Sequence, residues 1–206
     1  LLLTPQLESR EAYRSEWESN GITYRRIDTP ESIEELNPDA VICSGSRANV
    51  SMWEPWMDDA ARVLQQAVAA SIPVLGICFG HQLLCKTLGG EVQRSKSKST
   101  MISPLFSVGM DTLLSPIQMG LFTHQDEVTR LPPGARRIIS TKHCENAGMR
   151  VAGKPVWGVQ FHPEASRSVI EQAHADGDMN DVELAAFEND HDGDELLSAF
   201  AQLCMP

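Results

Sequence analysis

The sequence predicts an α/β fold, an open and mostly parallel sheet flanked by helices, with a small antiparallel β extension. Three observations support this prediction. In the first half of the chain, short apolar stretches alternate with helical patterns, as in a parallel sheet covered on both faces. At 73–88 an apolar strand turns directly into a helix. Between 91 and 161, short β-like pieces are separated by turn clusters, which indicates the antiparallel part.

Local signals place the expected elements along the chain. Asn20-Gly21 is a helix C-cap pair, Pro55 lies near the first turn of a helix, and Gly89-Gly90 ends another. The expected strands cover 1–3, 22–27, 40–43, 73–77, 105–108, 120–123, 137–140, 147–151 and 156–161. The expected helices cover 6–19, 32–36, 55–70, 79–88, 165–175 and 195–203.

Two polar stretches interrupt this pattern. Residues 94–100, Arg-Ser-Lys-Ser-Lys-Ser-Thr, are predicted to form a mobile loop. Its three bases either meet an anionic partner or are simply solvated. Residues 176–192 are rich in Asp, Asn and Gly and are predicted to be an acidic surface insertion. Because no repeat or linker interrupts the chain, we expect one domain over 1–206.

The charge is distributed unevenly. The chain has a net charge of −11, yet residues 168–206 contain no Lys or Arg. No basic stripe is present that would neutralise phosphates, so a nucleic-acid partner is not expected. Apolar runs are too short to span a bilayer, so no membrane partner is expected either.

The cysteines carry information about compartment and metals. The five cysteines are an odd set without a C-x-x-C pair. This pattern favours reduced thiols in a cytoplasmic setting and argues against a disulfide framework or a metal site.

The most informative stretch is the turn at Cys78. Gly76 and Gly80 flank this cysteine in the Gly-x-Cys-x-Gly spacing of a nucleophile elbow. Small neighbours permit a strained corner residue, and the helix that follows directs free N–H groups and its positive dipole end at the sulfur. The alternative is a core cysteine between two packing glycines.

A second candidate group follows the strand expected at 156–161. His162 and Glu164 are two positions apart, so on extended backbone their side chains point to the same side. They form a possible pair of base and orienting carboxylate at the sheet edge where ligands bind in open parallel sheets. The alternative is that Pro163-Glu164 simply starts a helix.

Three motifs together resemble the class I (triad) glutamine amidotransferases: Ser-Gly-Ser at 44–46, Gly-Ile-Cys-Phe-Gly-His-Gln-Leu-Leu at 76–84, and Gly-Val-Gln-Phe-His-Pro-Glu at 158–164. The resemblance runs from about residue 20 to 170 and implies a flavodoxin-like fold. Within the family the chain is most similar to the glutaminase portion of GMP synthase and its stand-alone relatives. His124-Gln125-Asp126 resembles the stretch that closes over glutamine in that subgroup.

The resemblance implies a mechanism and a role for each matched position. Glutamine would be hydrolysed through a cysteine thioester to glutamate and ammonia, without a cofactor. The implied catalytic residues are Cys78, His162 and Glu164. The implied oxyanion donors are the N–H of Phe79 and one from Gly45-Ser46, and the implied substrate-binding residues are Gly80, Gln82, His124 and Gln125. Asp126 either braces the glutamine loop or caps a turn, whereas His81 and Cys85 are expected to be structural.

The sequence also departs from the family. The usual glycine-glycine-proline turn is Gly45-Ser46-Arg47 here, and no synthetase sequence follows. Ammonia would therefore pass to a separate synthetase subunit. Two alternatives remain open: a γ-glutamyl peptidase or hydrolase that uses the same three side chains, and a non-catalytic subunit that has kept the motifs.

Overall fold

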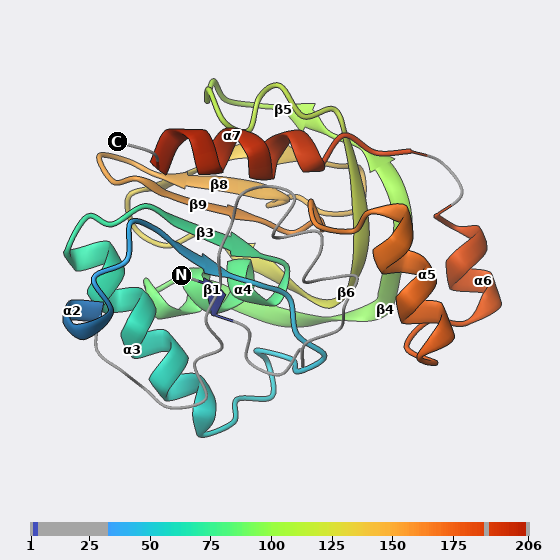
Figure 1. Ribbon diagram of the computed structural model, residues 1–206, viewed down its shortest axis with the longest axis horizontal. Helices are drawn as coiled ribbons and strands as arrows, with labels where there is room; N and C mark the ends of the chain where they lie inside the picture. Colours follow the sequence, from blue (N-terminus) through green and yellow to red (C-terminus); the bar gives the residue numbers. More distant parts are fainter. Residues whose placement is uncertain (1, 4–32, 188–189, 205–206) are drawn as a thin grey trace.

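The computed structural model describes residues 2–3, 33–187 and 190–204 (Figure 1). Its main sheet has seven strands in the order β1-β2-β3-β9-β8-β7-β5. The parallel strands are β1 (Leu2–Leu3), β2 (Val41–Cys43), β3 (Val74–Ile77) and β9 (Val156–Val159). The antiparallel strands are β8 (Gly148–Val151), β7 (Ala135–Ser140) and β5 (Phe106–Ser107). This is the predicted mostly parallel sheet with its antiparallel extension.

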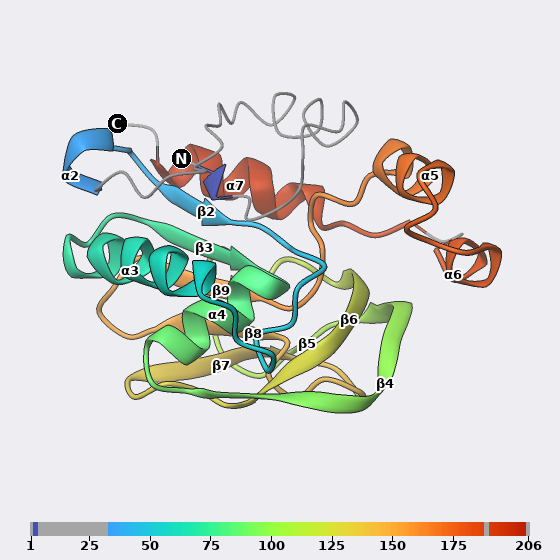
Figure 2. The same cartoon turned by 90° about the horizontal axis from the view of Figure 1, so that it is seen from below.

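Helices cover both faces of the sheet, because neighbouring residues of each central strand point to opposite sides. Val74 and Val156 contact one core with helices α3 (Trp56–Ala69) and α4 (Phe79–Thr87). Leu75 and Trp157 belong to a second apolar core, on the opposite face of the sheet, together with α7 (Asp194–Cys204). Figure 2 shows α7 on one side of the sheet and α3 with α4 on the other. The short helix expected at 32–36 is α2 (Ile33–Leu36).

A second sheet consists of two long strands, β4 (Glu91–Pro104) and β6 (Met119–Arg130), which pair antiparallel. The prediction of a mobile loop at 94–100 is wrong, because this segment lies within β4. Arg94, Ser99 and Thr100 pair with β6, which is distant in sequence, and the register shifts between Arg94 and Ser99, where a bulge or irregularity interrupts the pairing of residues 95–98. Most side chains of 93–98 are exposed, so the segment lacks the apolar alternation that identifies a strand.

The segment after β9 adds two helices, α5 (Arg167–Ala175) and α6 (Asp181–Ala185). A capping box of Asn180 and Glu183 opens α6. Phe187 is buried with Leu121 of β6 in a third apolar cluster. The acidic stretch 176–192 therefore contributes to the core as well as to the surface.

Some expectations lie outside the described residues, namely the helix at 6–19, its cap at Asn20-Gly21 and the strand at 22–27. In the described part of the chain, no helix has the length and apolar character needed to cross a membrane.

Candidate active site

Cys78 occupies the predicted corner between β3 and α4. Its backbone has φ 51° and ψ −105°, a conformation that L-residues rarely adopt. Its N–H donates to the Val159 carbonyl at 2.8 Å, which ties the corner to β9. A Cβ atom at Gly76 would lie 2.6 Å from the Gly80 carbonyl oxygen, and one at Gly80 would lie 1.9 Å from that of Cys43. The strand–turn–helix geometry therefore requires both glycines.

His162 and Glu164 form the predicted pair just beyond β9. Nδ1 of His162 lies 2.8 Å from Oε1 of Glu164, and the two side chains are 13% and 2% exposed. A carboxylate can only accept, so Nδ1 carries a proton and the ring orientation is fixed. Nε2 is buried and has no hydrogen-bond partner within the described residues.

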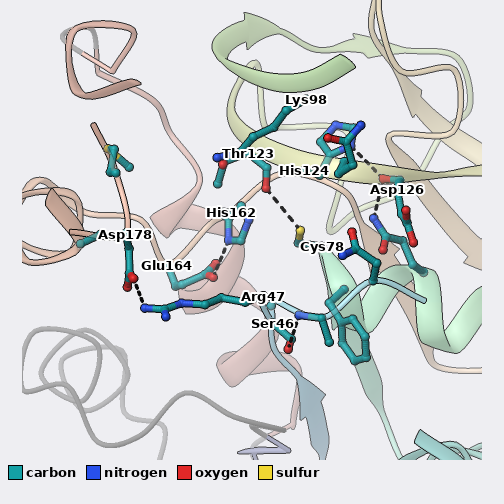
Figure 3. A pocket seen from close by; sticks show the side chains of 18 of the residues that line it. Ser46, Arg47, Cys78, Lys98, Thr123, His124, Asp126, His162, Glu164 and Asp178 are labelled. Carbon is teal, nitrogen blue, oxygen red and sulfur yellow. Dashed lines mark hydrogen bonds and ion pairs between the residues drawn. The ribbon is translucent and has the colours of Figure 1, made fainter. Parts of the chain in front are cut away.

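The thiol and the imidazole meet at one cavity. The point that a Cβ atom would occupy at Gly45 lies 2.9 Å from Cε1 of His162 and 3.8 Å from Cβ of Cys78. The Cys78 thiol also faces the carbonyl oxygen of Thr123 at 3.8 Å. Figure 3 shows the His162 ring between the Glu164 carboxylate and the Cys78 sulfur.

The electrostatics of this cluster favour a charged histidine. Burial on its own lowers the pKa of His162, but the negative charges of Cys78 and then Glu164, together with the hydrogen bond to Glu164, outweigh burial and raise that pKa well above the usual value. An imidazolium beside the sulfur stabilises a thiolate, which is the nucleophilic form of cysteine.

The cavity has a volume of about 490 Å³. Nearly all of the residues predicted to form the site line it, and they come from the turn after β2, from the start of α4, from β6 and from the segment after β9. They are Gly45, Ser46, Cys78, Phe79, Gln82, His124, Gln125, His162 and Glu164. Gly80 is the exception, because it packs against Cys43 instead of lining the cavity.

One wall of the cavity is a polar network on β6. Nδ1 of His124 donates to the Asp126 carbonyl at 2.9 Å, and its Nε2 is buried without a partner among the described residues. Burial lowers the pKa of His124 to about 4, so the ring is neutral and Nε2 is an acceptor. Gln82 donates to the Asp126 carbonyl at 2.7 Å and to Gln160 Oε1 at 3.1 Å.

Asp126 braces the loop before α3. Its carboxylate, 2% exposed, accepts the Ser51 N–H at 2.7 Å and the Ser51 hydroxyl at 2.8 Å. These bonds join β6 to the turn at Ser51, in the loop that follows the Gly45-Ser46 turn.

Sequence reasoning missed several lining residues, among them Arg47, Lys98, Thr123 and Asp178. Arg47 pairs with Asp178, and Lys98 pairs with Glu183 of α6. The polar stretch 94–100 and the acidic stretch 176–192 are the only sequence signals for these contacts, and neither signal identifies the pairs.

His81 and Cys85 lie apart from the cavity, as expected. His81 is fully buried, and its Nε2 lies 3.0 Å from the Asn146 carbonyl oxygen. Cys85 is buried, its thiol donates to the Arg130 carbonyl at 3.4 Å, and burial raises its pKa to about 12. Among the described residues, no group of three or more His, Cys, Asp or Glu side chains is arranged to hold a metal ion.

The chain is similar to known proteins. The family model for class-I glutamine amidotransferases matches residues 11–179. Glutamine-hydrolyzing GMP synthase of Clostridium novyi is 33% identical over 150 residues, which cover 69% of this chain and 27% of that protein. The chain thus spans about a quarter of the length of such a relative. A glutamine-hydrolyzing GMP synthase subunit of Pyrococcus abyssi is 29% identical over 179 residues, 84% of this chain and 80% of that protein.

A solved structure shares the fold. The glutamine amidotransferase of Methylobacillus flagellatus matches with a TM-score of 0.76 and 20% identity, over 98% of this chain and 92% of that one. Since the family model extends over most of the sequence, the chain belongs to the class I glutamine amidotransferases, a family of enzymes.

Proposed function

We propose that this protein hydrolyses the side-chain amide of glutamine and supplies the ammonia to a separate synthetase subunit, as a GMP-synthase-like glutaminase. The observation that carries the proposal is the convergence of Cys78, His162 and Glu164 at one cavity. A strained cysteine, an imidazole and a buried carboxylate are the parts that nucleophilic acyl transfer needs.

In the first half of the reaction, the Cys78 sulfur attacks the side-chain carbonyl carbon of glutamine. The C–S bond forms as the carbonyl π electrons move to the oxygen. His162 holds the proton that the thiol has lost and gives it to the nitrogen as the C–N bond breaks, so ammonia leaves. Glu164 keeps the ring in the required tautomer and stabilises the imidazolium.

The tetrahedral oxyanion needs donors that are already in place. The N–H of Phe79, at the start of α4, is one proposed donor, and the Gly45-Ser46 turn provides the other. The positive end of the α4 dipole acts in the same direction. Gly45 has little room for a side chain because His162 lies beside it.

In the second half, water attacks the γ-glutamyl thioester. His162 takes a proton from this water, the C–S bond breaks, and glutamate leaves. Gln82, His124 and Gln125 bind the amino-acid end of glutamine, and Nε2 of His124 offers an acceptor inside the cavity. Gly80 acts indirectly, because it lets α4 approach β2.

The partner proposal rests on the relatives. The chain matches about a quarter of a longer protein named as a glutamine-hydrolyzing GMP synthase and most of a protein that is itself named as one subunit of such an enzyme. A separate synthetase subunit that uses the ammonia is the corresponding arrangement for this chain.

The test is ammonia release from glutamine by the purified protein, measured alone and with candidate synthetase subunits. Cys78→Ala should abolish release, and a γ-glutamyl thioester on Cys78 should be trapped by acid quench and seen by mass spectrometry. Absence of ammonia release under both conditions would count against the proposal. Faster turnover of γ-glutamyl peptides than of glutamine would instead indicate a γ-glutamyl peptidase.

A further inference from the structure

The turn that carries one proposed oxyanion donor is attached to the far side of the cavity by an ion pair. Arg47 directly follows Ser46, and its guanidinium pairs with the carboxylate of Asp178, 131 positions later in the chain. Both residues line the cavity. Figure 3 shows the Arg47 side chain extending past Glu164 to reach Asp178.

Local contacts also hold the turn, since the Ser44 hydroxyl donates to the Gly45 carbonyl at 3.2 Å. Its N-terminal end continues from β2, where Cys43 packs against Gly80. Inside the turn, the Ala48 N–H donates to the Ser46 hydroxyl at 3.1 Å. Arg47 is the residue of this turn whose side chain is fixed to another part of the protein by a charged contact, so the pair restricts the orientation of the peptide groups beside it.

The other end of the ion pair is itself well anchored. Asp178 follows α5, whose C-terminus is closed by Gly177 with φ +76° and by the Asp178 N–H, which donates to the Ala173 carbonyl at 2.9 Å. Met179 packs against the third apolar cluster, which includes the buried Phe187. Asp178 thus offers Arg47 an attachment point, in a pair whose Asp178 side chain is 19% exposed and whose Arg47 side chain is 62% exposed.

We propose that Arg47 is a positioning residue, which holds the Gly45-Ser46 turn in the orientation needed to donate to the oxyanion by pairing with Asp178. This inference rests on the proposed function. Arg47 does not itself contact the reacting atoms. Its effect is therefore on the chemical step, with little effect on glutamine affinity.

The experiment compares glutamine hydrolysis by wild type, Arg47→Gln, Asp178→Asn and the double variant. Loss of a direct oxyanion donor costs about 10²–10³-fold in kcat, so loss of a positioning contact should cost about 5- to 30-fold, with KM changed by less than about twofold. Because both single variants break the same pair, the double variant should fall no further than either one.

A second readout separates positioning from general damage. Alkylation of Cys78 by iodoacetamide is a substitution at saturated carbon and forms no oxyanion, so its rate should stay the same in Arg47→Gln. The matched control is Glu183→Gln, which removes the ion pair between Lys98 and the stretch 176–192 but keeps a side chain able to complete the capping box. This control should keep wild-type kcat.

The possible results discriminate clearly. Equal kcat in wild type and Arg47→Gln, multiplied effects in the double variant, or a parallel loss of alkylation rate and thermal stability would each overturn the positioning role. A wild type that releases no ammonia with any partner would instead count against the proposed function.

Discussion

Nδ1 of His162 and Oε1 of Glu164 are 2.8 Å apart in a buried setting, and the Cys78 thiol lies at the opposite end of the ring. The imidazole is thus placed between two groups that carry negative charge in their ionised forms. These groups reverse the effect of burial and raise the pKa of His162 well above its ordinary value.

Glu164→Gln should therefore change both activity and pH dependence. The amide removes one of the charges that raise the pKa of His162, and it disturbs the tautomer that the carboxylate selects. We expect kcat for glutamine to fall by about 10²- to 10⁴-fold, measured as ammonia release.

The stability effect has a defined sign. Since the folded pKa of His162 is raised, its contribution to the free energy of unfolding is fully present below the unfolded value of about 6.5 and is lost as the pH rises through the folded pKa. Urea denaturation from pH 6 upward should show this loss in wild type and a smaller loss in Glu164→Gln. The pKa values of His81 and His124 are lowered to about 4, so these residues add stability as the pH rises through their unfolded pKa of about 6.5, and this contribution is common to both proteins and cancels in the comparison. An identical pH profile in the two proteins would contradict the coupling.

Thiol reactivity should be confined to one cysteine. Burial raises the pKa of Cys43, Cys85 and Cys144 to about 12. Burial is also the main reason why the pKa of Cys204 is raised to about 11. These four thiols are therefore protonated at neutral pH. Cys78 faces the cavity beside His162. Iodoacetamide at pH 7.5 should add one label, located at Cys78 by peptide mass spectrometry.

The control for this labelling is His162→Ala, which removes the imidazole beside the Cys78 sulfur. Alkylation of Cys78 by iodoacetamide should be at least about tenfold slower in this variant. Labelling of Cys43 or Cys144 at a comparable rate in the folded protein would show that the environments assigned to these thiols are wrong.

The brace at Asp126 should affect glutamine binding more than chemistry. Asp126→Asn weakens two hydrogen bonds to Ser51 and disturbs the strand that carries His124 and Gln125. We expect a loss of about 1–3 kcal/mol in the free energy of unfolding, and a severalfold rise in KM for glutamine with a smaller change in kcat.

Ser51→Ala is the matched control, because it removes the hydroxyl bond to Asp126 but keeps the bond from the backbone N–H. It should cost about 1 kcal/mol and leave KM near the wild-type value. If the two variants shift KM equally, the carboxylate does not act through the backbone of this loop.

The sequence was sufficient wherever the constraint is local. The corner at Cys78 follows from two glycines at fixed spacing, and the pairing of His162 with Glu164 follows from their positions two residues apart after a strand. Helices α2, α3, α4, α5 and α7 and the central strands could be predicted for the same reason, since apolar periodicity and caps act over a few residues, but α6 within the acidic stretch was not predicted.

Contacts between distant segments could not be predicted in this way. β4 is a strand because β6 pairs with it, and its Arg-Ser-Lys-Ser-Lys segment contains no apolar alternation. The Arg47–Asp178 pair joins residues that only the folded chain brings together. Gly80 illustrates a further limit, because its motif position suggested substrate contact whereas the structure gives it a steric role.

That steric role provides a sharp test of the elbow. By helix propensity alone, Gly80→Ala should stabilise α4 by about 1 kcal/mol. A Cβ atom there would lie 1.9 Å from the Cys43 carbonyl oxygen, however, and backbone on both sides cannot move aside cheaply. We therefore expect a loss of about 3 kcal/mol in the free energy of unfolding and a loss of glutaminase activity, since Cys78 shifts with α4.

Gly153→Ala provides the comparison. A Cβ atom at Gly153 meets nothing within 4 Å, so the substitution is opposed by the positive φ of +69° alone. We expect a loss of about 1 kcal/mol in the free energy of unfolding, and glutaminase activity should be retained. Urea denaturation and ammonia release should be measured on both variants. If Gly80→Ala proves as stable and active as Gly153→Ala, close packing of α4 on β2 does not hold the cysteine in its strained conformation, and the corner must be maintained by its hydrogen bond to Val159 instead.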